Sequence, residues 1–383
     1  MNARLSSTFP QFQIPREAWP SLLLLLVLVL LPVGRTSEAP LVVAGIAGLV
    51  LAWRARAGLA RDGAIRLVAA VFLCYWLPAL ISAPDAVAPA KTWDTVAVAL
   101  RFLPFAAFAA LALRNTSALI HAAAAVVALW LLDAWVQIFT GYSFGGPMEA
   151  ERITGVFGAG NPKLGPVLAV LSPFVFAAAR ERWGRRGLAA AFVFQLVPVL
   201  LAGSRAGWLM FALVALAFVW RETRAPLRFV AWSVFALVIA VAAAAIADRD
   251  SHAFAKRVQR TLLAFEGSEH AVDEAGAGRV RIWRTAVKMA ADHPINGVGA
   301  RGFRYAYPAY AGAGDTFVDP NTDEGASHAH QIVLEVASET GVVGIVFWII
   351  GAAFAYRAWR RAGALARERA RAPALALAAM TFP

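Results

Sequence analysis

The histidine pair His328 and His330 and several arginines lie in one long polar segment, which runs from about Asp248 to Ser327 and on to His330. Guanidinium groups bind phosphates through paired hydrogen bonds, and a neutral imidazole can take a proton from a hydroxyl near pH 7. A segment of this length is rarely a mere connector. We therefore expect anion binding and acid–base chemistry here.

Four cations of this segment lie on a predicted helix, GRVRIWRTAVKMAADHP, which Pro294 ends. They are Arg279, Arg281, Arg284 and Lys288. Their spacing spreads them over more than one helix face, so only some can converge on one anion. A solvated helix scatters charges in a similar way. The functional interpretation rests on the absence of any acidic residue between Arg279 and Ala291.

His328 and His330 allow two interpretations, a metal site or a general base. Asp319, Asp323 and Glu324 are the nearby acids, but the set lacks the tight spacing typical of metal ligands. We therefore predict no metal. A base needs only one neutral imidazole beside a substrate hydroxyl, although a lone histidine at a helix start is usually structural. The residues alone do not decide whether the histidine is a base or structural.

The composition is that of a membrane protein with many spans. Hydrophobic residues make up 60% of the 383 residues, charged residues only 16%, and the mean hydropathy is +0.61, which lies outside the soluble globular range. The single cysteine, Cys74, excludes an intramolecular disulfide and is expected to be buried. The first 19 residues have no small-residue cleavage site after them, so we predict a retained first span.

Apolar runs bounded by charges, Pro and Gly predict the spans. They lie near 20–34, 39–53, 67–83, 95–113, 117–140, 163–179, 188–203, 207–220, 229–247 and 342–356. A further run from Ala374 to Pro383 is too short to cross. We expect an all-α polytopic protein with about 11–12 transmembrane helices, of which the last one or two are incomplete.

The arginines predict the orientation of these spans. With the N-terminus inside, the inward loops hold four groups of arginines, near 54–66, 180–186, 221–228 and 357–371. The long loop then faces outward, which in a bacterium is the periplasm. The domains expected are residues 1–247 with nine helices, 248–341 as one large helical periplasmic loop, and 342–383 with the last helices.

Several polar residues lie in or at the ends of the predicted spans. Arg101 and Asp133 fall at similar depth in consecutive spans, so they could pair with each other or bind substrate. Arg205 lies in the tight outer turn GSRAGW, where it either reaches lipid headgroups or holds an anion. Another outer loop, from Arg152 to Pro162, combines an arginine with glycines that let backbone approach a ligand.

At these residues the chain resembles the O-antigen ligase family. The family pattern is His, then Asn, Ser or Gln, nine residues, Gly, two residues, and Gly, Thr or Tyr; His330-Gln331, Gly341 and Gly344 satisfy it. Further similarities, in family order, are DAWVQIFTG from Asp133, RITGVFGAGNP from Arg152, GSRAGW, GRVRIW from Arg279, and PINGVG from Pro294. Ala159-Gly160 depart from the asparagine-rich versions of the second motif.

The resemblance implies a membrane glycosyltransferase with a glycosyltransferase-C-like fold in the bacterial inner membrane. It would transfer O-antigen from undecaprenyl pyrophosphate to a lipid A-core hydroxyl on the periplasmic face, without a metal or other cofactor. His330 would be the base, with Arg205 and Arg279 on the pyrophosphate. The substrate-binding residues expected are Arg152, Gln331, Arg101, Asn161, Arg281 and His328.

Three alternatives remain open. An O-antigen polymerase differs from a ligase in its acceptor, and a protein O-oligosaccharyltransferase would usually carry a further large outer region. A flippase or transporter of lipid-linked glycans would instead place charged residues through the membrane midplane. No nucleic-acid partner is expected, and the sequence does not show the oligomeric state.

Overall fold

The computed structural model describes residues 18–113, 116–149, 152–247, 259, 273, 276 and 278–380. The first 17 residues, most of the first part of the predicted long loop (248–277), and the last three residues lie outside the described residues. Between its loops, the regular secondary structure of the described chain is helical apart from the hairpin of β1 (Tyr142–Ser143) and β2 (Gly146–Pro147), so the predicted all-α class is confirmed.

The helices follow the predicted spans closely. They are α1 (Trp19–Val29), α2 (Glu38–Arg54), α3 (Arg56–Leu59), α4 (Gly63–Ser82), α5 (Pro89–Ala99), α6 (Phe102–Ala112), α7 (Thr116–Thr140), the 3-10 turn η1 (Gly155–Phe157), α8 (Leu164–Leu201), α9 (Arg205–Thr223), α10 (Pro226–Ala247), α13 (Arg279–Asp292), α14 (Phe303–Tyr310), α15 (Ile332–Arg361) and α16 (Ala364–Met380).

Six of the described helical stretches are long and apolar enough to cross a membrane. They are α4, α5 with α6, α7, α8, α9 and α15. One of them, α8, bends at Gly184 and so contains two of the predicted spans, whereas α1 and α10 are shorter apolar helices. The chain is thus a polytopic membrane protein, and the count of 11–12 crossings stays a prediction.

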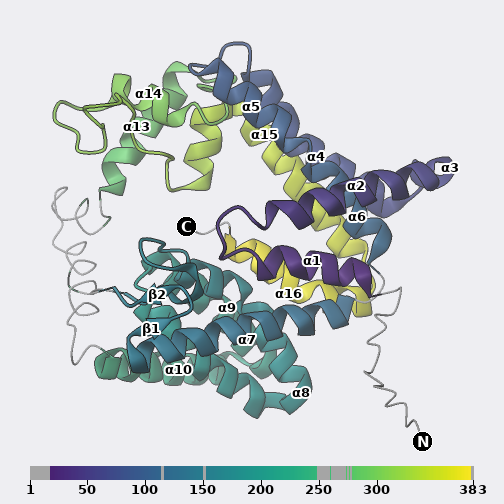
Figure 1. Ribbon diagram of the computed structural model, residues 1–383, viewed down its shortest axis with the longest axis vertical. Helices are drawn as coiled ribbons and strands as arrows, with labels where there is room; N and C mark the ends of the chain where they lie inside the picture. Colours follow the sequence, from purple (N-terminus) through teal and green to yellow (C-terminus); the bar gives the residue numbers. More distant parts are fainter. Residues whose placement is uncertain are drawn as a thin grey trace, which may run out of the picture.

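The long helices form two groups, one around α7, α8, α9, α10 and α16 and the other around α2, α4, α6 and α15 (Figure 1). The first group packs around buried aromatic and aliphatic side chains, among them Trp130, Phe176 and Phe218. Many large apolar side chains on the outer faces of these helices are exposed. Such a surface suits contact with lipid tails.

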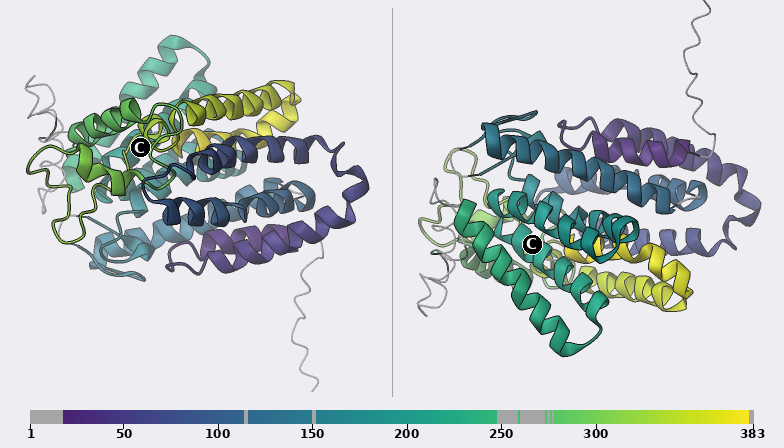
Figure 2. Two further views of the ribbon diagram at one scale, coloured as in Figure 1. Left: turned by 90° about the horizontal axis from the view of Figure 1, so that it is seen from above. Right: turned by 90° about the horizontal axis from the view of Figure 1, so that it is seen from below.

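The two ends of the molecule differ in character. Figures 1 and 2 show α13, α14, β1 and β2 at one end of the long helices and α3 at the other. We call the first the loop end. We call the second the arginine-rich end, and it also holds the α9–α10 turn and the start of α16. Ion pairs hold these segments together: Glu222 binds Arg180 and Arg185 beside the Gly184 bend, and Arg221 binds Glu368.

A sharp bend at Gly341 joins the loop end to the last long span. Gly341 has φ +61°, and α15 changes direction there. The segment from Pro294 to Gly299 packs into this bend: the N–H groups of Val342 and Val343 donate to the carbonyls of Pro294 and Ile295 at 2.8 and 3.1 Å. The predicted start of a span at residue 342 agrees with the bend.

The bend demands glycine for two reasons. A Cβ on residue 341 would lie 2.3 Å from the Ile295 carbonyl oxygen, and φ +61° is strained for any L side chain. We expect Gly341→Ala to lower the free energy of unfolding by about 1–3 kcal/mol and to reduce the yield of folded protein in detergent. Thermal melts of the purified protein would measure this.

Gly312→Ala is the matched control, because Gly312 also lies at the loop end but has open space around it and no positive φ. Equal melting temperatures for the Gly341 variant and the Gly312 variant would contradict the steric argument.

Candidate active site

His330 is held by its neighbours in an unusual backbone conformation. Its φ is +54°, in the left-handed region that side-chain-bearing residues rarely adopt. The preceding residue, Ala329, is fully buried and fastened at both backbone groups: the Trp283 indole donates to its carbonyl at 3.1 Å, and Glu335 accepts its N–H. Strain sustained in this way is typical of functional sites.

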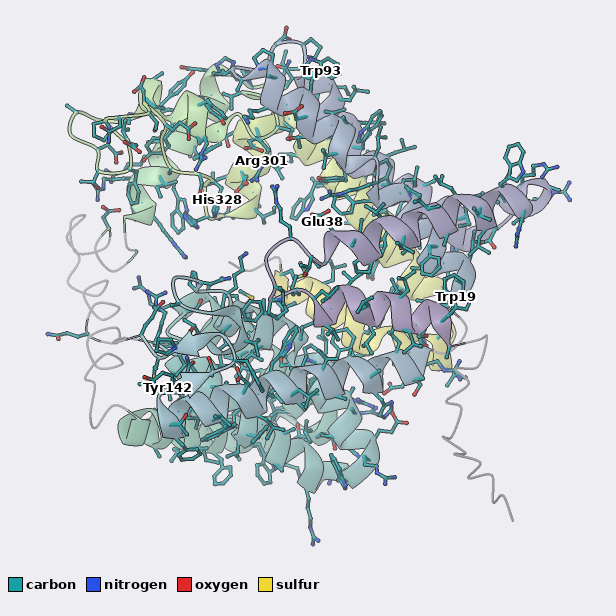
Figure 3. All side chains as sticks on the ribbon, viewed as in Figure 1. Trp19, Glu38, Trp93, Tyr142, Arg301 and His328 are labelled. Atoms are coloured by element: carbon teal, nitrogen blue, oxygen red, sulfur yellow. The ribbon has the colours of Figure 1, made fainter. Side chains whose placement is uncertain are left out.

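The two predicted histidines lie side by side. The ring centroids of His328 and His330 are 4.0 Å apart at an angle of 52°, and Nδ1 of His328 hydrogen bonds with the Ser327 hydroxyl at 2.8 Å. In the view of Figure 3, His328 and Arg301 lie on the side of this segment that is turned toward Glu38 at the start of α2.

The surroundings of His330 keep its imidazole neutral. Burial, and after it the positive charges of His328 and Arg279, together lower the pKa of His330 from 6.5 to about 4. Arg279, the first residue of α13, is therefore an electrostatic neighbour of His330, as predicted. Because the folded-state pKa is depressed, this group contributes stability above about pH 6.5 that is lost as the pH falls toward 4.

The segment that carries His330 is anchored to the membrane helices through Pro294–Gly299 and Ala300. Val298 and Gly299 donate backbone hydrogen bonds to Ser338 and Glu339 of α15 at 2.8 and 3.0 Å. On the other side, the carbonyls of Val298 and Ala300 accept from the Val87 N–H at 2.9 Å and the Thr92 hydroxyl at 3.0 Å. The candidate site is thus fixed relative to α4, α5 and α15.

Arg281 and Gln331 have structural contacts that sequence reasoning did not foresee. Arg281 forms an ion pair with Asp273 at 2.8 Å and lies over the Phe317 ring. The Gln331 side chain accepts from the Leu334 N–H at 2.6 Å and so caps α15. Their assignment to substrate binding stays a prediction.

Arg101 does not pair with Asp133, so that expectation was wrong. Arg101 forms an ion pair with Glu38 at 2.6 Å, between the α5–α6 junction and the start of α2. Asp133 is buried in α7, where its carboxylate accepts from the Phe144 N–H at 2.8 Å. Equal depth in consecutive helices did not bring the two side chains together, because each turns toward a different neighbour.

Gln137, one turn along α7 from Asp133, holds the loop that follows Arg152 through hydrogen bonds. Its side-chain oxygen accepts from the Thr154 and Gly155 N–H groups at 2.9 and 2.8 Å, and its amide donates to the Gly146 carbonyl at 3.4 Å. In the described chain, the polar residues of α7 therefore support the turns that follow it.

Arg152, Asn161 and Arg205 belong to neighbouring turns at the loop end. Arg152 forms an ion pair with Glu149 at 3.4 Å, and Asn161 accepts from the Lys163 N–H at 3.3 Å before α8 begins. The Ile153 N–H donates to the Leu201 carbonyl at 3.2 Å, which joins the Arg152 loop to the turn before Arg205. Arg205 itself begins α9, as its predicted place in a tight turn requires.

Glu335, Trp283 and Arg301 are the site residues that sequence reasoning missed. Glu335 and Trp283 fasten Ala329, and Arg301 adopts φ +63° and is an electrostatic neighbour of Glu335. The signal for Glu335 was its place in the first turn of the helix that follows His330. The other two contacts join segments distant in sequence, which a single sequence does not reveal.

Fold and site together define a multi-pass, all-α membrane protein with a histidine–arginine site beside its spans. Residues 189–349 match a family model described as O-antigen ligase, and this match supports the assignment of the chain to the O-antigen ligase family. The matched segment contains Arg205, Arg279, His330 and Gly341. No curated protein matches the chain.

The match also supports a general function. Members of this family are membrane glycosyltransferase-like enzymes, and the match supports a ligase- or polymerase-type function in lipopolysaccharide biosynthesis. Lipid-linked glycans and membrane lipids are the general partners that follow from it.

The electrostatic environment of His330 gives a direct prediction. In isotope-labelled protein, the His330 ring should titrate near pH 4, as followed by nuclear magnetic resonance. Arg279→Gln should move this titration to higher pH, because one of the positive charges that oppose protonation is gone.

Lys288→Gln is the control, since it removes the same charge from the same helix nine residues further along. A His330 titration near pH 6.5, or equal shifts in the Arg279 and Lys288 variants, would contradict the proposed arrangement.

Proposed function

We propose that the protein is an O-antigen ligase, which transfers a glycan from undecaprenyl pyrophosphate to a hydroxyl of the lipid A core. The observation that carries this proposal is the neutral, half-buried imidazole of His330 beside Arg279, on backbone fastened by Trp283 and Glu335. This arrangement supports the proposal of a positioned base next to an anion site.

In the proposed reaction, the acceptor hydroxyl oxygen attacks the anomeric carbon of the donor glycan. Its proton passes to a ring nitrogen of His330, the bond from the anomeric carbon to the pyrophosphate oxygen breaks, and undecaprenyl pyrophosphate leaves. Negative charge grows on the leaving group as that bond breaks. Arg279 and Arg205 stabilise it through guanidinium hydrogen bonds, without a metal.

Donor binding and base strength are coupled in this proposal. The positive charge of Arg279 depresses the pKa of His330 in the free protein. A pyrophosphate bound to the arginine offsets that charge, so the imidazole becomes a stronger base when the donor is present. The proton acceptor would then be most effective in the complex that reacts.

The orientation of the spans is also part of the proposal. Arginines concentrate at the end opposite the candidate site, and the positive-inside rule assigns such an end to the cytoplasm. The loop end then faces the periplasm of a bacterial inner membrane. A lipid-anchored pyrophosphate would lie at the outer boundary, beside the turn that precedes Arg205.

Two enzyme alternatives share this chemistry. In an O-antigen polymerase the acceptor is a second lipid-linked glycan, and in a protein O-oligosaccharyltransferase it is a protein hydroxyl. Arg152, Asn161, Arg281, Gln331, His328 and Arg101 are proposed to contact substrate in each case. A flippase, by contrast, would not depend on His330.

The reaction products test the proposal. Purified protein, given a lipid-pyrophosphate glycan and lipid A core, is expected to form the conjugate and not an elongated donor, as scored by gel mobility and mass spectrometry. His330→Ala should abolish transfer because the proton acceptor is lost, while size-exclusion profiles stay unchanged.

His293→Ala is the control, because its side chain lies outside the candidate site and the protein should remain active. Elongated donor as the main product would favour the polymerase. Normal transfer by the His330 variant would remove His330 as the base.

In this proposal the planar shape of the Arg205 guanidinium matters as well as its charge. Arg205→Lys keeps the charge but loses the planar fork that binds two phosphate oxygens, so we expect the transfer rate at saturating donor to fall by at least about tenfold. Arg357→Lys, at the arginine-rich end, should leave the rate unchanged. Equal rates for the Arg205 variant and the parent would exclude Arg205 from the transition state.

A further inference from the structure

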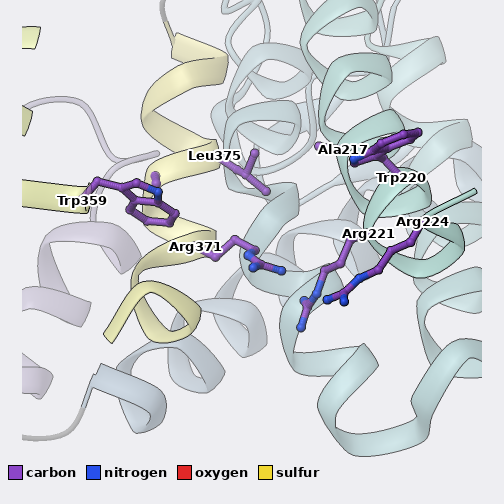
Figure 4. Close-up of a pocket in the computed structure, with 8 residues that line it drawn as sticks. Ala217, Trp220, Arg221, Arg224, Trp359, Arg371 and Leu375 are labelled. Carbon is purple, nitrogen blue, oxygen red and sulfur yellow. The ribbon is translucent and has the colours of Figure 1, made fainter. Parts of the chain in front are cut away.

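A cavity of about 490 Å³ opens at the arginine-rich end, far along α9 from the candidate site. It lies between the end of α9, the end of α15 and the middle of α16. Its lining includes Trp220, Arg221, Arg224, Trp359, Arg371 and Leu375. Figure 4 shows the guanidinium groups of the three arginines turned toward the same space between α9 and α16.

Positive charge exceeds negative charge in this cavity. Glu368 binds both Arg221 and Arg371, the latter at 3.1 Å, so one carboxylate serves two guanidiniums. Arg224, exposed at the end of α9, brings a third. Three arginines against one glutamate leave two positive charges, which attract an anion.

The rest of the lining is apolar or aromatic. Ala217, Ala374 and Leu375 supply aliphatic surface, and the indoles of Trp220 and Trp359 come from the ends of two long helices. Tryptophan near the end of a membrane span marks the level of the lipid headgroups. A ligand that suits this lining joins an anionic group to an apolar chain.

We propose that this cavity binds the phosphate of an anionic phospholipid from the leaflet at the arginine-rich end. The guanidiniums hold the phosphodiester, and the indoles and Leu375 contact the first part of the acyl chains. Basic cavities between membrane helices on the cytoplasmic side take such headgroups. A soluble phosphate compound lacks the chain that the apolar lining would cover.

The bound lipid joins α9 to α16 and α15 at their common end. Because Arg221 already binds Glu368 of α16, the phosphate adds to an existing contact. The inference does not rest on glycosyl transfer, since the cavity and the candidate site lie at opposite ends of the described helices.

The test measures lipid binding to the full protein in a neutral detergent. Native mass spectrometry and thermal melts with phosphatidylglycerol, phosphatidylcholine and inorganic phosphate form the three arms. We expect a concentration-dependent rise in melting temperature with phosphatidylglycerol alone. The double variant Arg224→Gln/Arg371→Gln should weaken the apparent Kd by about twenty-fivefold, roughly fivefold for each arginine removed.

Two further variants separate binding from damage to the fold. Arg228→Gln removes a charge from the same end outside the cavity lining and should bind as the parent does. Glu368→Gln removes the competing carboxylate and should strengthen phosphatidylglycerol binding, an effect that misfolding cannot produce.

Three results would overturn the proposal. These are equal binding of phosphatidylcholine, equal stabilisation by inorganic phosphate, or unchanged phosphatidylglycerol affinity in both the double variant and the Glu368 variant.

Discussion

The attachment of Ala329 at both of its backbone groups is the constraint on which the candidate site depends. With its carbonyl held by Trp283 and its N–H held by Glu335, the chain enters His330 from a fixed direction and takes a left-handed conformation there. The strain is of the order of 1–3 kcal/mol and is offset by these partly buried contacts. The position of the His330 backbone is thereby fixed, with Arg279 as an electrostatic neighbour of its imidazole.

The bend at Gly341 connects the fixed backbone around His330 to the membrane spans. The short first part of α15 carries Glu335, and the part after the bend is an apolar span that packs against α4. The Pro294–Gly299 segment closes the bend and rests on the α4–α5 turn. One backbone network therefore links the imidazole to the spans that would hold two lipid substrates, and the interval from His330 to Gly341 is a structural requirement.

Most of the helices could be predicted from the sequence, because membrane spans are recognised by their local composition. The spacing of the histidine and the glycines is also a local pattern. The starts of α2, α7 and the post-bend part of α15 fell within a few residues of the predicted spans. The partner of Arg101 could not be predicted: Glu38 lies 63 residues away in sequence, and nothing local distinguishes it from Asp133. Trp283 and Gln137 were missed as supports for the same reason, since their bonds join distant segments. The roles of Arg205 and Arg279 as phosphate ligands remain predictions.

We propose that an imidazole and two guanidiniums surround a lipid pyrophosphate at the loop end. A cryo-electron microscopy structure of the protein with bound undecaprenyl pyrophosphate tests it most directly. We predict phosphate oxygens within about 3.2 Å of guanidinium nitrogens of both Arg205 and Arg279, with the His330 ring on the side open to an acceptor. Phosphates bound away from these arginines, or a His330 ring remote from the donor, would contradict the account.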